Sequence, residues 1–194
     1  KTIIMMLSFI VPVLMINFLF LAPWAVLLLH VIMGFALAGI GMSVMHDANH
    51  GAYSKNMKVN NWLGYSLNMI GGMVFNWKLQ HNVLHHTYTN VHKMDDDIAD
   101  KLILRFSPHA EVKKIHRFQF IYVFFFYGIL TLYWFVAKDF IQYFKYRKEG
   151  TNRFTKTENR KYFASMVFLK LLFLTYMIIL PIAVRGYSAS LIIG

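Results

Sequence analysis

The run IIMMLSFIVPVLMINFLFLA, residues 3–22, contains no charged side chain in twenty positions. As an α-helix, a run of this length rises about 30 Å, which matches the hydrocarbon core of a bilayer. We therefore predict a transmembrane helix over residues 3–22. A signal peptide is the alternative for such a run, but a second apolar run follows immediately and favours a membrane hairpin.

The second run, residues 23–45 (PWAVLLLHVIMGFALAGIGMSVM), is also free of charge. Because almost no connector separates the two runs, we expect a tight helical hairpin with Pro23 and Trp24 at its tip. A further apolar run, residues 162–184, is interrupted only by Lys170. Together these runs predict an all-α, multi-pass transmembrane protein, folded as one domain over residues 1–194.

Residues 118–137 (FQFIYVFFFYGILTLYWFVA) form one more apolar run, for which two interpretations stay open. Its length permits it to span a bilayer. Basic segments lie on both sides of it, however, and the positive-inside rule would keep both segments in the cytoplasm. The run is therefore either a spanning helix or a re-entrant one.

The charge of the chain is concentrated beside its apolar runs. The formal net charge is +11, residues 46–117 hold nine Lys/Arg against six Asp/Glu, and residues 138–161 hold eight against three. Such flanking charge is typical of positive-inside topology and of contact with anionic lipid headgroups. We therefore expect a lipid bilayer, and no nucleic acid, as the partner of these basic segments.

Histidines gather at two places in a chain that has nine histidines and no cysteine. The segment HDANH holds His46 and His50, and the segment HNVLHH holds His81, His85 and His86. A spacing of four places two imidazoles on one face of a helix, where both can reach one ion. Five imidazoles without thiolates suit iron, zinc or copper, and do not suit magnesium or calcium.

The segment between these two histidine boxes decides whether they can share a site. Residues 62–77 begin and end with tryptophan and contain Gly71 and Gly72. A helix of this length rises only about 24 Å, which is short for a span, so we expect an interfacial or re-entrant element. Both boxes then lie on one side of the membrane, at its cytoplasmic surface. Three of the four remaining histidines are expected to be structural: His30, His109 and His116.

The two boxes, written HDANHG and HNVLHHTYTNVHKMDDDI, resemble those of the membrane fatty acid desaturase superfamily. The sequences of the two boxes are most similar to those of bacterial acyl-CoA or acyl-lipid desaturases of the front-end, or linoleoyl-CoA, branch. The resemblance implies two irons per complete site, with five ligands in this chain: His46, His50, His81, His85 and His86. It also implies a third box, H/Q-x-x-H-H, after the last membrane helix. This sequence has no such motif, so we expect a partial chain.

Ligand imidazoles need acceptors for their second ring N–H, and carboxylates or amides near the boxes are candidates. They are Asp47, Asn49, Asp95, Asp96 and Asp97. For the three consecutive aspartates, a solvated loop is the alternative. His92 matches a recurrent position of the superfamily, and we expect it beside the ligands rather than among them.

The activity implied by the resemblance is the dioxygen-dependent introduction of a double bond into a fatty acyl chain. The implied substrate is an acyl-CoA or an acyl-lipid, and the implied electron donor is external, such as cytochrome b5 or ferredoxin. The membrane would be the bacterial inner membrane, or the endoplasmic reticulum in a eukaryote. Three alternatives stay open: a lipid, alkane or carotenoid hydroxylase, a non-enzymatic metal or haem membrane protein, and an inactive fragment.

Overall fold

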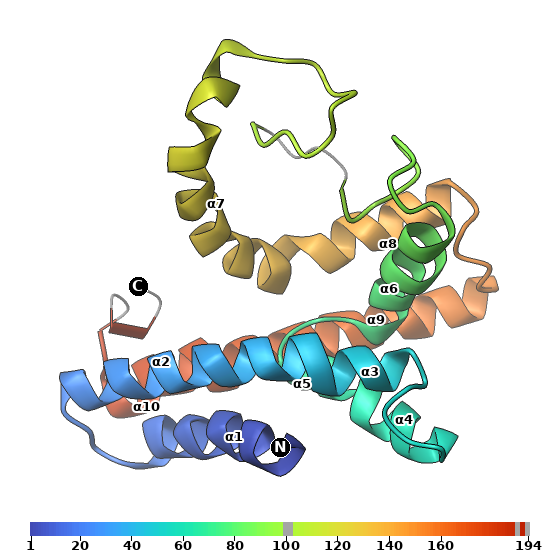
Figure 1. Cartoon of the computed structure of the whole chain (residues 1–194). Helices are drawn as coiled ribbons and strands as arrows, with labels where there is room; N and C mark the ends of the chain where they lie inside the picture. Colours follow the sequence, from blue (N-terminus) through green and yellow to red (C-terminus); the bar gives the residue numbers. More distant parts are fainter. Residues whose placement is uncertain (99–102, 189–190, 193–194) are drawn as a thin grey trace. The chain divides into compact units, whose positions relative to one another are not determined.

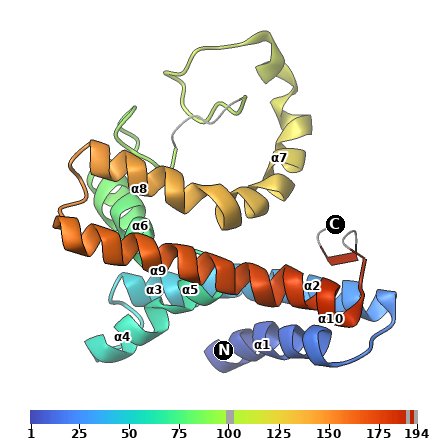
Figure 2. The ribbon, with the colours of Figure 1, turned by 180° about the vertical axis from the view of Figure 1, so that it is seen from behind.

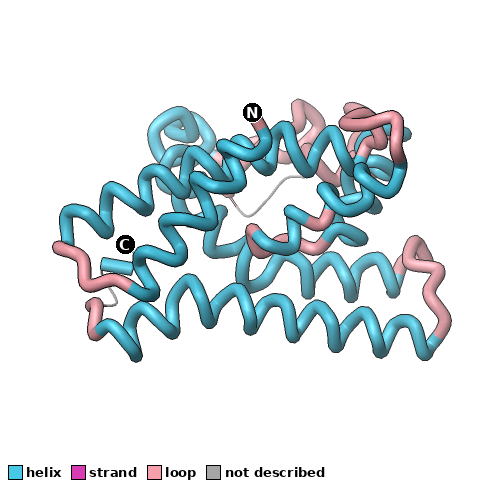
Figure 3. The backbone as a smooth tube through the Cα atoms, turned by 90° about the horizontal axis from the view of Figure 1, so that it is seen from below, coloured by secondary structure: helices cyan, strands magenta, loops and turns pink. Residues whose placement is uncertain are grey.

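The computed structural model describes residues 1–98, 103–188 and 191–192. These residues form helices joined by loops and contain no β-strand, which confirms the predicted all-α class (Figure 3). The chain divides into two compact units, one made of residues 1–71 and 156–194 and the other of residues 72–155. The order of the helices along the chain is labelled in Figure 1.

The first unit begins with a helical hairpin. Helix α1 (Thr2–Phe18) ends where Leu19 turns to an extended conformation, so it is shorter than the apolar run that predicted it. Helix α2 (Pro23–Gly39) starts with proline at its first position, where the missing N–H costs no hydrogen bond. The π-helical turn η1 (Ile40–Val44) then continues directly into helix α3 (Met45–Asn49).

The first unit also contains a long helix from the second half of the chain, Lys156–Arg185 (Figure 2). It is built from α9 (Lys156–Leu174), the π-helical turn η5 (Thr175–Ile179) and α10 (Leu180–Arg185). The end of this helix packs beside α1. There Asn17 donates from Nδ2 to the backbone carbonyl of Tyr176 at 2.9 Å, and Arg185 Nε donates to the backbone carbonyl of Asn17 at 2.6 Å. These two hydrogen bonds link the end of α1 to η5 and α10 within an apolar part of the first unit.

Among the described residues, two helices are long and apolar enough to cross a membrane, Pro23–Asn49 and Lys156–Arg185. Little of their most apolar windows is buried within the protein, 28% and 17% respectively, so most of this apolar surface faces outward. That is the pattern of helices whose solvent is lipid. Helix α1 is apolar but shorter.

Residues 62–77 do not form one helix. Helix α4 (Met57–Gly64) and helix α5 (Ser66–Met69) end before Gly71, whose φ of +88° suits glycine, and α6 (Val74–Trp77) begins after it. The backbone of this break is held from the apolar helix α9, because the buried Lys170 donates from Nζ to the Gly71 carbonyl at 2.5 Å. Lys170 therefore has a hydrogen-bonding role inside the run that it interrupts.

The second unit holds the second histidine box and the ambiguous apolar run. Helix α6 continues into the π-helix η2 (Lys78–His85), and a loop leads to the 3₁₀ turn η3 (Lys114–Phe118). Helix α7 (Gln119–Tyr133), the π-helical turn η4 (Trp134–Lys138) and helix α8 (Asp139–Lys148) follow. The two halves of this last assembly are bent by 56° relative to each other, so together they form either a broken span or a re-entrant element.

Candidate metal centre

The second histidine box lies on a π-helix, which brings its three imidazoles together. The ring centroid of His81 lies 5.2 Å from that of His85 and 4.8 Å from that of His86. A π-helix closes its hydrogen bonds over one more residue than an α-helix does. The fourth and fifth residues after His81 therefore both lie near it. On an α-helix, His86 would instead lie about 100° further round than His85.

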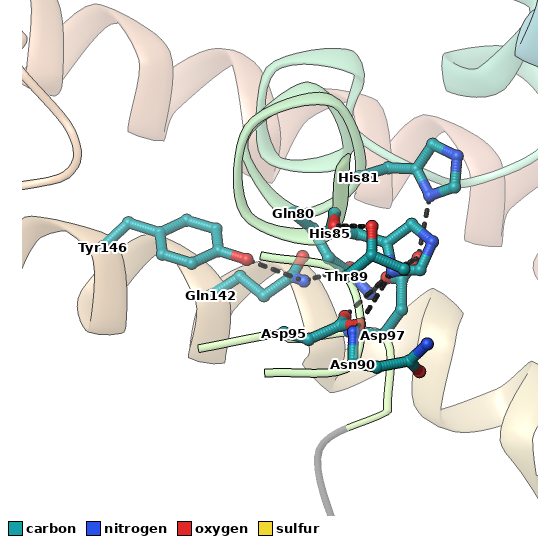
Figure 4. Close-up of polar contacts among 9 residues, drawn as sticks. All are labelled: Gln80, His81, His85, Thr89, Asn90, Asp95, Asp97, Gln142 and Tyr146. Carbon is teal, nitrogen blue, oxygen red and sulfur yellow. Dashed lines mark hydrogen bonds and ion pairs between the residues drawn. The ribbon is translucent and has the colours of Figure 1, made fainter. Parts of the chain in front are cut away.

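Two carboxylates hold two of these imidazoles (Figure 4). Asp97 Oδ2 lies 2.7 Å from His81 Nδ1. The two oxygens of Asp95 lie 2.9 and 3.0 Å from His85 Nδ1. A carboxylate only accepts hydrogen bonds, so each Nδ1 carries the proton and each Nε2 keeps its lone pair. Neutral imidazoles held in this way are the form in which histidine binds a metal.

Asp95 is the centre of a tight turn that follows the box. Its side chain is buried, and it accepts hydrogen bonds from the backbone N–H of Asn90 at 2.9 Å and of Asp97 at 3.0 Å. Burial raises the pKa of Asp95, but the hydrogen bonds from Asn90, His85 and Asp97 lower it by more, so the pKa lies below its ordinary value. Asp95 is therefore an anion fixed beside His85.

The donor set of this box fits a transition metal. One ligand atom each of His81, His85 and Asp97 lies within 4.8 Å of the others. Asp97 already lies at hydrogen-bond distance from His81 Nδ1, so it is better placed to orient that ring than to bind an ion itself. His81 Nε2, which has the lone pair, is buried. Nitrogen-rich sites of this kind suit iron, zinc or copper.

The three consecutive aspartates have different partners. Asp95 and Asp97 contact the histidines, whereas Asp96 accepts a hydrogen bond from the Tyr146 hydroxyl at 2.8 Å and pairs with the Lys145 ammonium. Asp96, one of the predicted acceptors for an imidazole, thus bonds to helix α8 instead. The side chains of consecutive residues in a turn point in different directions, so the sequence did not indicate which aspartate bonds to a histidine.

The first histidine box lies in the first unit, on α3 and at its end. The rings of His46 and His50 are 4.5 Å apart between centroids, in an edge-to-face arrangement. This places both imidazoles on one face, as their spacing predicted. His46 Nδ1 lies 3.1 Å from Asp47 Oδ1, and the side chain of Asp47 is half exposed. That these two imidazoles share a site with His81, His85 and His86 stays a prediction.

Two buried asparagines support the first box. Asn49, predicted as an acceptor for an imidazole, donates from Nδ2 to the Gly64 carbonyl of α4 at 3.2 Å. Asn60, which sequence reasoning missed, is fully buried and bonds with the loop after the box: its Nδ2 donates to the carbonyls of Gly51 and Ser54, and its Oδ1 accepts from Ser54 N–H. A polar residue inside the amphipathic α4 was the only available signal for it.

His92 contacts Ser107 and His109, which lie outside the carboxylate turn. Its Nδ1 lies 3.3 Å from Ser107 Oγ, and its ring centroid is 5.5 Å from that of His109. Both rings line a pocket of about 360 Å³, together with His116 and the side chains of Arg105 and Lys113. These contacts place His92 in a basic pocket with the two histidines expected to be structural, and its expected position beside the metal ligands stays a prediction.

Comparison with known proteins adds a family. The sequence model described as fatty acid desaturase matches residues 22–193. The sn-1 linoleoyl-lipid 6-desaturase of Arthrospira platensis is 34% identical over 85% of this chain, and that of Synechocystis sp. is 36% identical over 84%. The acyl-lipid (8-3)-desaturase of Physcomitrium patens is 35% identical over 84%.

The chain spans less than half the length of these relatives: 44%, 45% and 32% of each, in the same order. No solved structure matches the chain.

Proposed function

This chain belongs to the fatty acid desaturase family, and on that premise we propose that it forms the histidine-bearing part of an iron enzyme that introduces a double bond into a fatty acyl chain. The observation that carries the proposal is the pair of imidazoles, His81 and His85, each held at Nδ1 by a carboxylate. Such pairs are the arrangement in which a protein prepares histidine for a metal.

The residues that would hold two irons are the five box histidines. Iron, when bound, supplies from dioxygen an oxidant strong enough to remove hydrogen from an unactivated methylene, which no side-chain acid or base can do. The protein's part is to hold each ligand ring in one tautomer and one orientation. Asp97 and Asp95 do this for His81 and His85 by keeping the proton at Nδ1.

The electron balance of this chemistry requires a partner. Removing two hydrogens from the acyl chain supplies two of the four electrons that reduce dioxygen to two waters, so two more must come from an external donor. We propose a small redox protein such as cytochrome b5 or ferredoxin for this role. The net positive charge of +11 would favour a donor with an acidic surface.

The substrate that we propose is an acyl chain carried on a membrane lipid. Three relatives are named for activity on lipid-linked acyl chains, and this favours an acyl-lipid over an acyl-CoA. The outward-facing apolar surfaces of Pro23–Asn49 and Lys156–Arg185 would place the protein in the same bilayer as such a substrate. A bacterial inner membrane is the proposed location.

The test is product formation in cells. We expect the chain, expressed with any native continuation in a host rich in saturated and monounsaturated lipids, to produce acyl chains with one additional double bond, measured by gas chromatography. Replacing His85 with alanine should abolish that product while the protein still accumulates in membranes, because the helices insert through other residues.

His109→Ala is the matched control, since His109 has its ring contact with His92 and not with the box histidines. It should retain product. Full activity of His85→Ala would contradict the ligand assignment. A hydroxylated acyl product would show that the protein inserts oxygen into the acyl chain and does not introduce a double bond.

A further inference from the structure

One face of helix α8 carries three polar side chains, and two of them, Gln142 and Tyr146, bond beside the second histidine box and at the carboxylate turn (Figure 4). Asp139, Gln142 and Tyr146 are spaced by three and four positions, which aligns them along one side of a helix. All three are buried. The sequence had indicated only a charged connector here, so these buried polar groups have no role in the function derived so far.

A directed chain of hydrogen bonds leads from this face to a box histidine. Gln142 Nε2 donates to Gln80 Oε1, Gln80 Nε2 donates to Asp97 Oδ1 at 2.6 Å, and Asp97 Oδ2 accepts from His81 Nδ1 at 2.7 Å. Asp97 fixes the donor-to-acceptor direction of these hydrogen bonds. Because Asp97 only accepts, Gln80 must present its NH₂ group to Asp97 and its oxygen to Gln142.

The second donor of Gln142 closes the network consistently. Gln142 Nε2 also lies 3.3 Å from the Tyr146 hydroxyl oxygen, and the Tyr146 hydroxyl donates to Asp96 Oδ2 at 2.8 Å. One face of α8 therefore bonds to the neighbour of His81 and to the neighbour of Asp97. It contacts the π-helix at Gln80 and the carboxylate turn at Asp96.

The start of the same helical segment is held as well. Asn76, fully buried on α6, donates from Nδ2 to the Asp139 carbonyl at 2.8 Å. Helix α8 thus contacts the segment that bears the box ahead of its histidines, at Gln80 beside His81, and at the turn after them. A contact that served packing alone would not need this sequence of matched donors and acceptors.

We propose that Gln142 is a positioning residue for the metal centre: through Gln80 it orients the Asp97 carboxylate and thereby holds the His81 imidazole in its metal-binding tautomer. This inference rests on the proposed iron-binding function. Partners of this kind around a ligand typically change metal affinity by about 10- to 100-fold when removed. Gln142 is two hydrogen bonds further from the ring than Asp97 is, so we expect the lower end of that range, about tenfold.

The experiment measures metal affinity of the full chain purified in detergent, without turnover. Cobalt(II) is the probe, its binding followed by visible absorption in competition with a chelator. Gln142→Met keeps the size of the side chain and removes its donors, and it should weaken cobalt binding about tenfold. Gln142→Glu keeps the shape and also lacks the NH₂ group, so it should weaken binding similarly and serves if the methionine variant does not fold.

Gln119→Met is the matched control. Gln119 is a glutamine of the same unit whose amide bonds to both backbone groups of Arg105, away from the histidines. Its loss should lower thermal stability but leave cobalt affinity unchanged. Asp97→Ala supplies the second comparison: if Gln142 acts through Asp97, then Gln142→Met should cause no further loss of affinity in the Asp97→Ala background.

The outcomes separate the two proposals. A wild-type chain that binds no cobalt would overturn the proposed function and this inference with it. Cobalt binding that is unchanged in Gln142→Met and Gln142→Glu, or that falls equally with and without Asp97, would overturn the inference alone. A loss in Gln119→Met as large as in Gln142→Met would also overturn it, since both would then report general destabilisation.

Discussion

Asp47 and Asp95 are both carboxylates next to box histidines, and they differ in burial. The side chain of Asp47 is 51% exposed, whereas that of Asp95 is fully buried. An exposed pair between such groups contributes little, because water screens it and solvates both partners. When a buried carboxylate is removed, water cannot reach its hydrogen-bond donors, so they are left without an acceptor. The two residues therefore predict different responses to the same chemical change.

Asp95→Asn should damage both the fold and the metal centre. The amide keeps the shape but replaces one accepting oxygen with a donor, which faces the N–H of Asn90 or of Asp97 or the ring of His85. We expect a loss of about 1–3 kcal/mol in the free energy of unfolding. Cobalt affinity should fall by about 10- to 100-fold. Thermal melting and cobalt titration of the purified protein measure these effects.

Asp47→Asn is the control for this substitution, with an expected change in stability of less than about 0.5 kcal/mol. Equal effects of the two variants would show that burial does not distinguish the two carboxylates.

Gly64 is required by the close approach of Asn49. A Cβ added at Gly64 would overlap Asn49 Oδ1 and lie 3.0 Å from Asn49 Cγ, so the buried Asn49 side chain would have to shift and would lose its bond to the Gly64 carbonyl. Gly64→Ala should therefore lower the free energy of unfolding by about 1–3 kcal/mol, as overpacking does. Gly128→Ala, where a Cβ meets nothing within 4 Å, should leave stability unchanged or slightly raised. A melting temperature unaffected by Gly64→Ala would contradict this packing.

At the scale of elements, π-helical geometry recurs where function and bending are needed. The second box lies on η2, and η1 leads directly into the helix of the first box. In both places the wider turn changes which residues face one another. Such turns are often found at functional sites, and their position cannot be derived from hydrophobic periodicity, because the apolar pattern of a few residues does not distinguish π from α.

The two ends of the bent assembly that contains α7 and α8 bond to different parts of the second unit. At its start, Gln119 bonds with the backbone of Arg105, and Tyr122 donates to the Ile103 carbonyl. At its end, α8 bonds to Gln80 and Asp96. A straight spanning helix would separate its two ends by the thickness of the bilayer. The 56° bend is compatible with either interpretation of residues 118–137, and the basic segments on both sides favour the re-entrant one.

Cysteine labelling checks this topology, since the chain has no native cysteine. We expect Glu149→Cys and Lys113→Cys to react with an impermeant maleimide from the same side of the membrane, because the positive-inside rule keeps the basic segments on both sides of residues 118–137 in the cytoplasm. Phe20→Cys, at the exposed tip of the first hairpin, should react from the opposite side. Labelling of Glu149→Cys and Lys113→Cys from opposite sides would establish a span.

At the scale of the whole molecule, large apolar side chains are exposed along the long helices. Phe35 on α2 is 79% exposed, Phe124 on α7 is 75% exposed, and Phe168 on α9 is 64% exposed. Water does not tolerate apolar surfaces that extend over whole helices, whereas lipid does. The protein should therefore sediment with membranes, resist extraction by alkaline carbonate and dissolve in detergent. Recovery in the soluble fraction without detergent would contradict membrane integration.

The sequence by itself determined the features that depend on neighbouring residues. Charge-free runs predict helices because an apolar solvent leaves the backbone no partner except itself. The His46–His50 spacing predicts rings on one face because helix geometry repeats within a single turn. The sequences of the two histidine boxes indicated the fatty acid desaturase family, which the comparison with known proteins confirmed. In each case the interacting groups lie within a few positions of one another.

Only the tertiary structure decided which groups meet across long separations in the chain. Asp97 holds His81 sixteen positions before it, Gln142 bonds to Gln80 sixty-two positions before it, and Asp96 turns away from the histidines to Tyr146. No periodicity encodes such pairs, because each depends on how a loop and a distant helix return to the box. Buried polar groups must find partners wherever the chain brings them, and the fold alone sets those places.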